Sequence, residues 1–215
     1  MRLYVIRHGQ SHVNVGDWAT LDSMDAGLTE KGHQQAVALR DWLKENGRTC
    51  DALYASTMLR TQETARYVEE AFDMESIPDD RIREIGNSAV DGSALPETGL
   101  PRVYNPLKPD KAPFAKRGID IENGESWMHF RTRLGQFVDD LIEKHQGRKV
   151  YVVAHGGVIS AMLDNIYNTG PYRNARTDTH NTGWSLFDHN PDIGRERWML
   201  IHHNRIDHLI LNDLL

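Results

Sequence analysis

The chain twice runs from a short apolar strand into a histidine that is followed by glycine. The first strand, Leu3–Ile6, leads into Arg7-His8-Gly9, and the second, residues 149–154, leads into His155-Gly156-Gly157. An apolar run that stops at glycine is typical of a strand in an open α/β sheet, whose carboxyl end is the usual position for ligands. We therefore expect an α/β fold in which both histidines lie where a ligand binds.

The first of these histidines is a candidate acceptor of a phosphoryl group. Neutral imidazole is nucleophilic, and a neighbouring cation such as Arg7 disfavours protonation of His8. Gly156 and Gly157, which follow the second histidine, permit close backbone approach. The N–H groups that begin the following helix would face an anion beside His155. A core histidine in an ordinary strand-to-helix turn is the alternative for this segment.

Residues 52–65 are predicted to form a strand, a Ser/Thr helix cap and a helix with Arg60 in its first turn. A cation there opposes the helix dipole, at a cost of a few tenths to about 1 kcal/mol, which indicates a compensating anion. The alternative is a solvated surface arginine.

Strands and helices alternate along the chain, which indicates the α/β class. A helix over residues 30–46 is expected to be capped by Thr29 and closed by Gly47. A length of 215 residues is consistent with one domain that buries roughly 70% of its unfolded surface. The other expected elements are strands at 2–7, 51–55, 76–78, 149–154, 184–187 and 197–202 and helices at 58–72, 125–146 and 158–167.

These segments resemble, in order, the motifs of the histidine phosphatase superfamily, also called the phosphoglycerate mutase-like family. The resemblance covers most of the chain and implies a three-layer α/β/α sandwich with a central, mostly parallel sheet. It also implies a single domain over residues 1–215, with a substrate-covering insertion at about 86–124. The matching residues are Arg7-His8-Gly9, Asn14, Leu28-Thr29, Gly32, Gln35-Ala36, Ser56, Arg60-Thr61, Thr64-Ala65, Glu84, Gly124-Glu125-Ser126 and His155-Gly156-Gly157.

By this resemblance, His8 is phosphorylated during turnover, and Arg7, Arg60 and His155 form a positive pocket around the phosphoryl group. The chemistry agrees, because phosphoryl transfer chiefly requires positioning and neutralisation of the equatorial oxygens. Two arginines and a protonated His155 could supply this without a metal.

The resemblance makes Glu84 the proton donor and adds Asn14 and Gly156 to the substrate-binding residues. An alkoxide is a poor leaving group, so a carboxylic acid must protonate it and later accept a proton from water. Glu84 also belongs to a run of charged residues at 79–84, a pattern more usual in solvated loops.

Residues 86–124 are expected to form a long irregular segment, and a loop of that length in a compact domain is usually functional. Its part 100–118 carries five Lys or Arg residues against one acid, with four of the eight prolines. We expect it to lie over the pocket and attract substrates with a second anionic group. A solvated surface loop is the alternative.

Composition limits the partners. A net charge of −6 without a long basic stripe argues against nucleic acid, and no apolar run approaches the length of a membrane span. Because there is no secretory leader before Leu3 and Cys50 is the single cysteine, we expect a cytoplasmic enzyme. We expect it to need no cofactor and to act on a small phosphorylated metabolite. A homodimer is left open.

The eleven histidines raise the possibility of a metal site, which we disfavour. Adjacent strand residues point to opposite faces, so His202 and His203 would not both line one site with His208. His180 and His189 are the other candidates near the last strands.

The leading hypothesis is a metal-independent phosphatase that acts through phosphorylated His8. A phosphoglycerate mutase would share this intermediate but exclude water from it. Glycolytic mutases usually have an Arg-Phe-x-Gly-Trp-like stretch where this chain has residues 15–20, and a Tyr-Gly-x-Leu segment where it has Ile85–Ser88. The Trp-Glu-Gly of many phosphatase members is absent there too, which leaves the substrate open. A third alternative is a catalytically weak phospho-ligand binding protein on the same fold.

Overall fold

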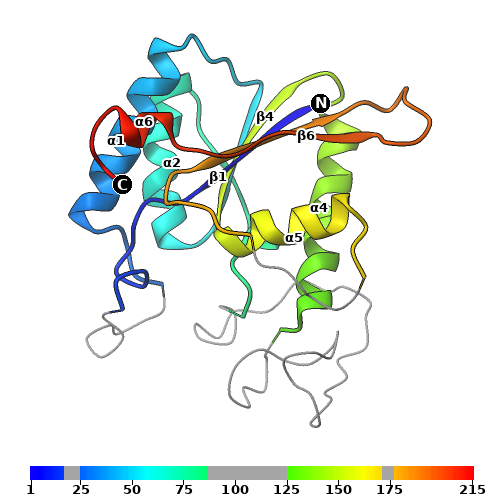
Figure 1. Cartoon of the computed structure of the whole chain (residues 1–215), viewed down its shortest axis with the longest axis horizontal. Coiled ribbons are helices and arrows are strands. Elements are labelled where there is room, and N and C mark those ends of the chain that lie inside the picture. Colours follow the sequence, from blue (N-terminus) through cyan, green and yellow to red (C-terminus); the bar gives the residue numbers. More distant parts are fainter. Residues whose placement is uncertain (17–24, 87–124, 171–176) are drawn as a thin grey trace.

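A six-stranded sheet forms the centre of the molecule (Figure 1). The structure, a computed structural model, describes residues 1–16, 25–86, 125–170 and 177–215. Along the sheet the strand order is β3-β2-β4-β1-β5-β6. Strands β1 to β4 are mutually parallel, and β5 runs antiparallel to both of its neighbours, which confirms the mostly parallel sheet. The strands are β1 (Arg2–Arg7), β2 (Ala52–Ser56), β3 (Ile77–Asp79), β4 (Lys149–Ala154), β5 (Trp184–His189) and β6 (Trp198–Arg205).

Helices cover both faces of the sheet. Successive strand residues point to opposite faces, so they pack into two separate cores. Leu3 and Val5 of β1 pack with the core that α4 and α5 cover, whereas Tyr4 and Ile6 pack with the core under α1 and α2. The three-layer arrangement is therefore confirmed (Figure 1). The helices are α1 (Glu30–Glu45), α2 (Leu59–Phe72), α4 (Trp127–Lys144), α5 (Gly156–Ile166) and α6 (Asp207–Ile210), with a 3-10 turn, η1, at Asp80–Ile82.

The N-terminal cap of α1 is as predicted, since Thr29 Oγ1 accepts a hydrogen bond from Gly32 N at 3.1 Å. The helix ends at Glu45, and Gly47 follows in the left-handed region with φ 57°.

The predicted Ser/Thr cap of α2 is wrong. Met58 occupies the cap position, and Leu59 N donates to Asp25 Oδ1 at 2.8 Å. The two hydroxyl residues have other partners, because Thr57 Oγ1 donates to Asp80 at 2.6 Å and Ser56 Oγ contacts the His155 ring. A carboxylate from a distant loop therefore caps this helix.

Two helices begin away from their expected starts. Helix α4 begins at Trp127 because Ser126 is its cap, with His129 N donating to Ser126 Oγ at 3.2 Å. Helix α5 begins at Gly156, directly after His155. Both glycines that follow His155 are therefore helical.

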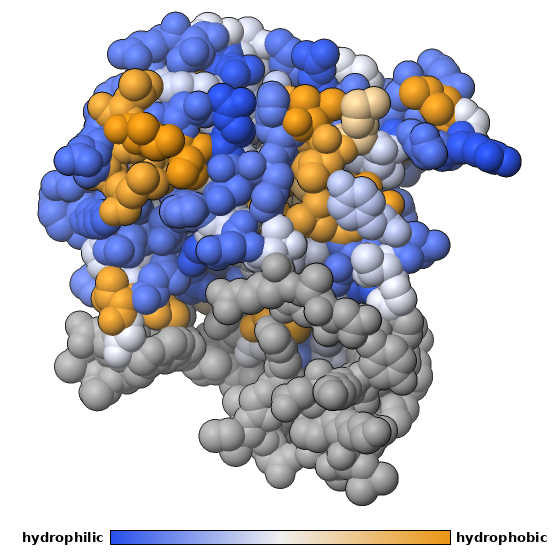
Figure 2. Space-filling model, in the orientation of Figure 1, coloured by the Kyte–Doolittle hydropathy of each residue, from blue (hydrophilic) through white to orange (hydrophobic). Residues whose placement is uncertain are grey.

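The proposed substrate-covering insertion, with its basic stretch at 100–118, lies outside the described residues except for Gly86. Within the described ranges, no helix combines the length and apolar character needed to cross a membrane. Exposed apolar side chains gather over β6, at Met199 and Ile201, and around α6, at Ile210 and Leu211 (Figure 2).

Candidate active site

The carboxyl ends of the parallel strands β2, β4 and β1 lie side by side and carry the predicted histidines. Arg7 pairs with Ala154 across β1 and β4, and His8 N donates to Ala154 O at 2.9 Å. The rings of His8 and His155 are buried, with centroids 5.2 Å apart and planes inclined by 64°. The strand ends therefore bring together the two side chains that the sequence analysis singled out.

The hydrogen bonds of His8 define which nitrogen carries its proton. Nδ1 lies 2.7 Å from the Gly9 carbonyl oxygen, which only accepts, so Nδ1 is the protonated nitrogen. Nε2 in turn accepts a hydrogen bond from Arg60 Nε at 3.2 Å. Nε2 is therefore the unprotonated nitrogen, and an imidazole needs such a nitrogen to act as a nucleophile.

The surroundings of both buried histidines favour the neutral ring. Burial lowers the pKa of His8 well below its ordinary value, and the charges of Arg60 and Arg7 lower it further. Burial likewise lowers the pKa of His155, with Arg60, His8 and Arg133 adding to the effect. The expected protonated His155 is therefore not the form favoured before an anion binds.

Of the two ring nitrogens of His155, one has a hydrogen-bond partner among the described residues. His155 Nε2 lies 2.9 Å from Ser56 Oγ at the end of β2, whereas buried Nδ1 has no hydrogen-bond partner within the part of the chain that the structure describes. A buried polar atom without a partner costs free energy, commonly about 1–3 kcal/mol. Nδ1 is therefore the nitrogen of His155 that can still form a hydrogen bond.

Arg60 lies in the first turn of α2, as predicted, and is 3% exposed. Its Nη1 is 3.9 Å from Asp25 Oδ1. Burial lowers the pKa of the Arg60 guanidinium, and the charges of Glu84 and Asp25 partly offset this effect. The lowering is too small to remove the positive charge of Arg60 at neutral pH. The interpretation as a solvated surface arginine is wrong.

Arg7 ends β1 and reaches across the site toward the segment before β5. Its Nη1 donates to the Thr179 carbonyl oxygen, and a Cβ atom on Gly156 would lie 3.7 Å from its Nε. Arg7 and the start of α5 are therefore neighbours. Gly156, expected to bind substrate, lies beside this arginine at the first position of the helix.

The carboxylate of Glu84 is held by two backbone amides. Oε1 accepts from its neighbour Ile85 N at 2.9 Å, and Oε2 accepts from Gly157 N at 3.0 Å. One N–H at the start of α5, which the sequence analysis expected to face a bound anion, therefore binds Glu84 instead. The glutamate lies close enough to Arg60 for its charge to raise the pKa of that arginine.

Asn14 braces the loop that follows His8. Its Oδ1 accepts from Ser11 N at 3.1 Å and from Asn181 Nδ2 at 3.1 Å, and the same Asn181 amide donates to the His8 carbonyl oxygen at 3.0 Å. The predicted substrate-binding residue thus also has a structural contact. Asn181 lies outside every motif matched in the sequence and was therefore not predicted.

Gly9 and Gly32 bring the loop of His8 against the start of α1. A Cβ atom on Gly9 would lie 2.6 Å from the Gly32 carbonyl oxygen, and one on Gly32 would overlap the Gln10 carbonyl oxygen. Neither position has room for a side chain. The two glycines of the matched motifs therefore serve the same close contact.

Two charged residues near the site also escaped the sequence analysis as site candidates. Asp25 both caps α2 and approaches Arg60. Arg83 is 8% exposed, and its charge lowers the pKa of Arg60. Arg83 was hidden in a charged run that is more typical of solvent-exposed loops, whereas Asp25 caps a helix that begins more than thirty residues later.

Among the described residues, no group of three or more His, Cys, Asp or Glu side chains is arranged to hold a metal ion. The C-terminal histidines have separate surroundings. His203 contacts Ser185 Oγ through Nδ1 and the Asp178 carbonyl oxygen through Nε2, whereas His208 Nε2 lies 2.8 Å from Thr182 Oγ1.

The fold and the order of these motifs have counterparts among known proteins. Residues 3–204 match the family model for the histidine phosphatase superfamily, branch 1. A probable phosphoglycerate mutase GpmB of Serratia proteamaculans is 25% identical over 195 residues, which cover 88% of this chain and 85% of that protein.

Two solved structures illustrate the similarity of fold. A mycobacterial glucosyl-3-phosphoglycerate phosphatase, solved with VO3, has a TM-score of 0.68 and 26% identity, and the match covers 94% of this chain and 98% of that one. A phosphoserine phosphatase variant of Entamoeba histolytica, solved with phosphoserine, has a TM-score of 0.70 at 22% identity, with 97% and 98% of the two chains covered.

The sheet order, the paired strand-end histidines and a family match that spans nearly the whole chain all agree. The chain belongs to the histidine phosphatase superfamily, branch 1, and has its phosphoglycerate mutase-like α/β fold.

Proposed function

We propose that this protein is a phosphatase that hydrolyses a small phosphomonoester without a metal, through a phosphohistidine on Nε2 of His8. The observation that carries the proposal is the state of the His8 ring. Nδ1 is committed to the Gly9 carbonyl, and the ring is neutral, with its remaining lone pair beside Arg60. A neutral imidazole held in one tautomer among cations is suited to attack on phosphorus.

In the first step, Nε2 of His8 forms a bond to phosphorus while the bond from phosphorus to the ester oxygen breaks. Arg60 Nε must turn from Nε2 to a phosphoryl oxygen, so that the same group that orients the ring then neutralises developing charge. Nδ1 of His155, which has no partner among the described residues, is a second donor once it carries a proton.

Glu84 supplies the proton that the departing alkoxide needs, and its carboxylate then takes a proton from an attacking water. That water forms the new bond to phosphorus, the bond between phosphorus and Nε2 breaks, and inorganic phosphate leaves. Position supports this role, since Glu84 is half-buried at the start of α5 and lies within electrostatic reach of Arg60. The backbone amides and Arg60 also stabilise the carboxylate, which is the form that accepts the proton from water.

A phosphoglycerate mutase is the second candidate, and the similarity to proteins named as probable phosphoglycerate mutases favours it. Both functions need the same phosphohistidine. They differ in whether water or a bound intermediate accepts the phosphoryl group.

The test is to trap the intermediate and identify the product. The enzyme is mixed with a ³²P-labelled phosphomonoester found by screening phosphorylated metabolites, quenched in alkali, which preserves phosphohistidine, and analysed for labelled histidine. We expect label on wild type and none on His8→Ala, with free phosphate as the product. His12→Ala is the matched control, because His12 is the nearest histidine in sequence and is exposed.

Activity above about a hundredth of wild type in His8→Ala, a difference in barrier of less than about 2.7 kcal/mol, would overturn covalent catalysis at this residue. Isomerised product without phosphate release would establish the mutase. Binding of phosphorylated ligands without a phosphoenzyme would leave the binding protein as the function.

A further inference from the structure

An arginine and a glutamate without a role in the proposed chemistry are buried against the segment 81–86, which carries Glu84. Arg133 lies on α4 and Glu125 just before it, and each side chain is 1% exposed. Their contact is bidentate, with Arg133 Nε 2.6 Å from Oε1 and Nη2 2.9 Å from Oε2 of Glu125. Such a fork pairing fixes both position and orientation of the two groups.

The remaining hydrogen bonds of the pair go to the short segment that carries Glu84. Arg133 Nη1 donates to the Arg81 carbonyl oxygen at 2.5 Å, and Nη2 donates to the Arg83 carbonyl oxygen at 2.9 Å. Glu125 Oε2 accepts from Gly86 N at 3.3 Å. The Arg83 carbonyl belongs to the peptide unit that joins Arg83 to Glu84, so the pair grips the backbone on both sides of the glutamate.

Stability alone is a poor explanation for this arrangement. A buried ion pair is often no more stabilising than apolar residues of similar volume, because both charges must leave water. An apolar pair would fill the same space between α4 and the 81–86 segment. Such an apolar pair would supply none of the three hydrogen bonds to the backbone of that segment. Those bonds hold the backbone on both sides of Glu84.

We propose that Arg133 and Glu125 are positioning residues for Glu84, which hold its backbone so that the carboxylate stays at the start of α5 and within reach of the leaving-group oxygen. The inference rests on the proposed function and assigns this pair a part in acid catalysis. Arg133 also acts on the second histidine, since its charge contributes to the lowered pKa of His155.

The experiment measures kcat/KM for a series of substituted phenyl phosphates whose leaving groups range from p-nitrophenol to p-methoxyphenol. The substrates have similar shapes, and kcat/KM reports the phosphorylation step, so its dependence on leaving-group pKa measures protonation by the acid. Misplacement of Glu84 affects poor leaving groups most. A general loss of folded protein would lower all rates equally.

Three variants separate positioning from stability. Arg133→Lys keeps the charge but not the fork, and Glu125→Gln keeps the shape. The double variant Arg133→Met with Glu125→Leu removes both charges together, so that neither is left buried without its partner. For each we expect about a 10- to 100-fold loss on the poorest leaving group and less than about a 3-fold loss on p-nitrophenyl phosphate, within the range that general acids contribute.

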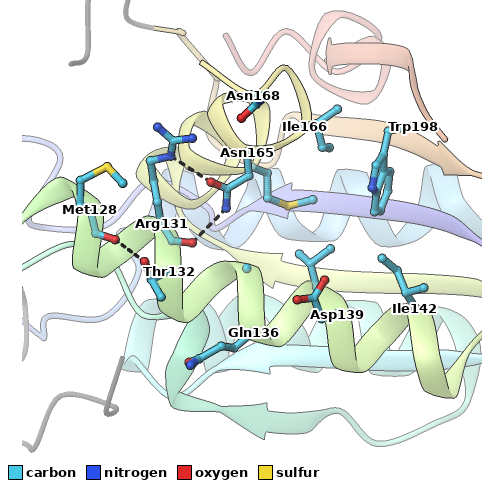
Figure 3. A pocket seen from close by; sticks show the side chains of 13 residues that line it. Met128, Arg131, Thr132, Gln136, Asp139, Ile142, Asn165, Ile166, Asn168 and Trp198 are labelled. Atoms are coloured by element: carbon cyan, nitrogen blue, oxygen red, sulfur yellow. Dashed lines mark hydrogen bonds between the residues drawn. The ribbon is translucent and has the colours of Figure 1, made fainter. Parts of the chain in front are cut away.

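Arg131→Met is the matched control on the same helix. Arg131 is also buried, but it connects α4 to α5 on the far side, donating to Asn165 Oδ1 at 2.9 Å and to the Asp164 carbonyl oxygen at 3.0 Å (Figure 3). It lines a groove of about 480 Å³ between these helices. Its guanidinium donates its hydrogen bonds to residues 164–170, not to residues 81–86. Its loss should lower the melting temperature without changing the leaving-group dependence.

Glu84→Gln, measured beside these variants, keeps the two proposals distinguishable. A steeper dependence in Glu84→Gln together with wild-type dependence in all three pair variants would overturn the positioning role alone. Equal losses on every substrate in Glu84→Gln would overturn Glu84 as the acid and the positioning proposal with it. A steeper dependence in the pair variants but not in Arg131→Met supports the proposal.

Discussion

Gly157 N donates to Oε2 of Glu84 at 3.0 Å, and a Cβ atom at this glycine would overlap Oε1 and lie 2.8 Å from Cδ of the same carboxylate, so a side chain fits here only if the glutamate moves. The first turn of α5 and the glutamate are therefore complementary in shape as well as in charge. A backbone amide at a helix N-terminus favours a carboxylate at this position.

Gly157→Ala should therefore displace Glu84 while leaving His8 in place. We expect kcat/KM for an alkyl phosphomonoester to fall about 10²-fold, the lower end of what a general acid contributes, and the phosphoenzyme still to form from p-nitrophenyl phosphate. Steady-state kinetics on the two substrates checks this. Gly135→Ala is a suitable control, since among the described residues a Cβ there would meet only Asn165 Nδ2, at 3.8 Å. Equal effects of the two substitutions would contradict the expectation.

Replacing the glutamate itself should have a similar signature without a steric change. Glu84→Gln keeps an oxygen that can accept from Gly157 N but removes the transferable proton. Turnover of an alkyl phosphomonoester should fall about 10²- to 10⁴-fold, with a much smaller loss on an activated aryl phosphate. Parallel kinetics with the two substrates measures the difference. If both losses proved alike, another carboxylate, such as that of Glu97 outside the described residues, would become the candidate acid.

His208 should make the fold sensitive to acid. Its ring is buried, Nε2 lies beside Thr182 Oγ1, and burial lowers its pKa to about 4. Below pH 6.5 the unfolded chain takes up a proton that the folded ring refuses, so this residue's contribution is complete above pH 6.5 and is lost as the pH falls toward 4. The loss should reach about 3 kcal/mol at pH 4.

Urea unfolding at pH 7.5 and pH 4.5, for wild type and His208→Gln, measures this contribution. The free energy of unfolding should fall less in the variant than in wild type over that interval, because glutamine does not titrate. His12→Gln, at an exposed position, should behave as wild type. An unchanged pH dependence in His208→Gln would show that other groups, such as His8 and His155, account for the acid sensitivity.

Vanadate should inhibit tightly, and EDTA should not inhibit. Arg7, Arg60 and His155 are the groups proposed to neutralise the phosphoryl oxygens, and vanadate adopts a five-coordinate geometry that resembles in-line transfer. Transition-state analogues bind about 10² to 10⁸ times more tightly than substrates. Inhibition constants and dialysis against EDTA provide the measurement. Activity that EDTA removes and zinc or magnesium restores would refute the metal-free mechanism.

Features encoded by short segments could be predicted from the sequence. The strands that lead to His8 and His155 are apolar runs closed by glycine. The predicted helix at 30–46 has its cap and its apolar spacing within one continuous segment, so local physics suffices. The position of Arg60 in the first turn of α2 could be predicted from such a local pattern, and a cation there is unusual enough to mark the residue as a site candidate.

Contacts between distant segments could not be predicted from the same patterns. Asp25 caps α2, and Arg133 reaches carbonyl groups about fifty residues away in sequence. The protonation state of His155 depends on the sum of burial and four neighbouring groups, which only the assembled site defines. The hydrogen bond that occupies Gly157 N likewise requires knowing that Glu84 lies next to α5.

The contact between Gly9 and Gly32 joins α1 directly to the backbone beside His8, the proposed nucleophile. Side chains can rotate to absorb a small displacement, but here backbone meets backbone, and such contacts in a close-packed interior transmit strain. A shift of α1 along its axis would therefore move the peptide that accepts the His8 Nδ1 hydrogen bond and change the aim of Nε2.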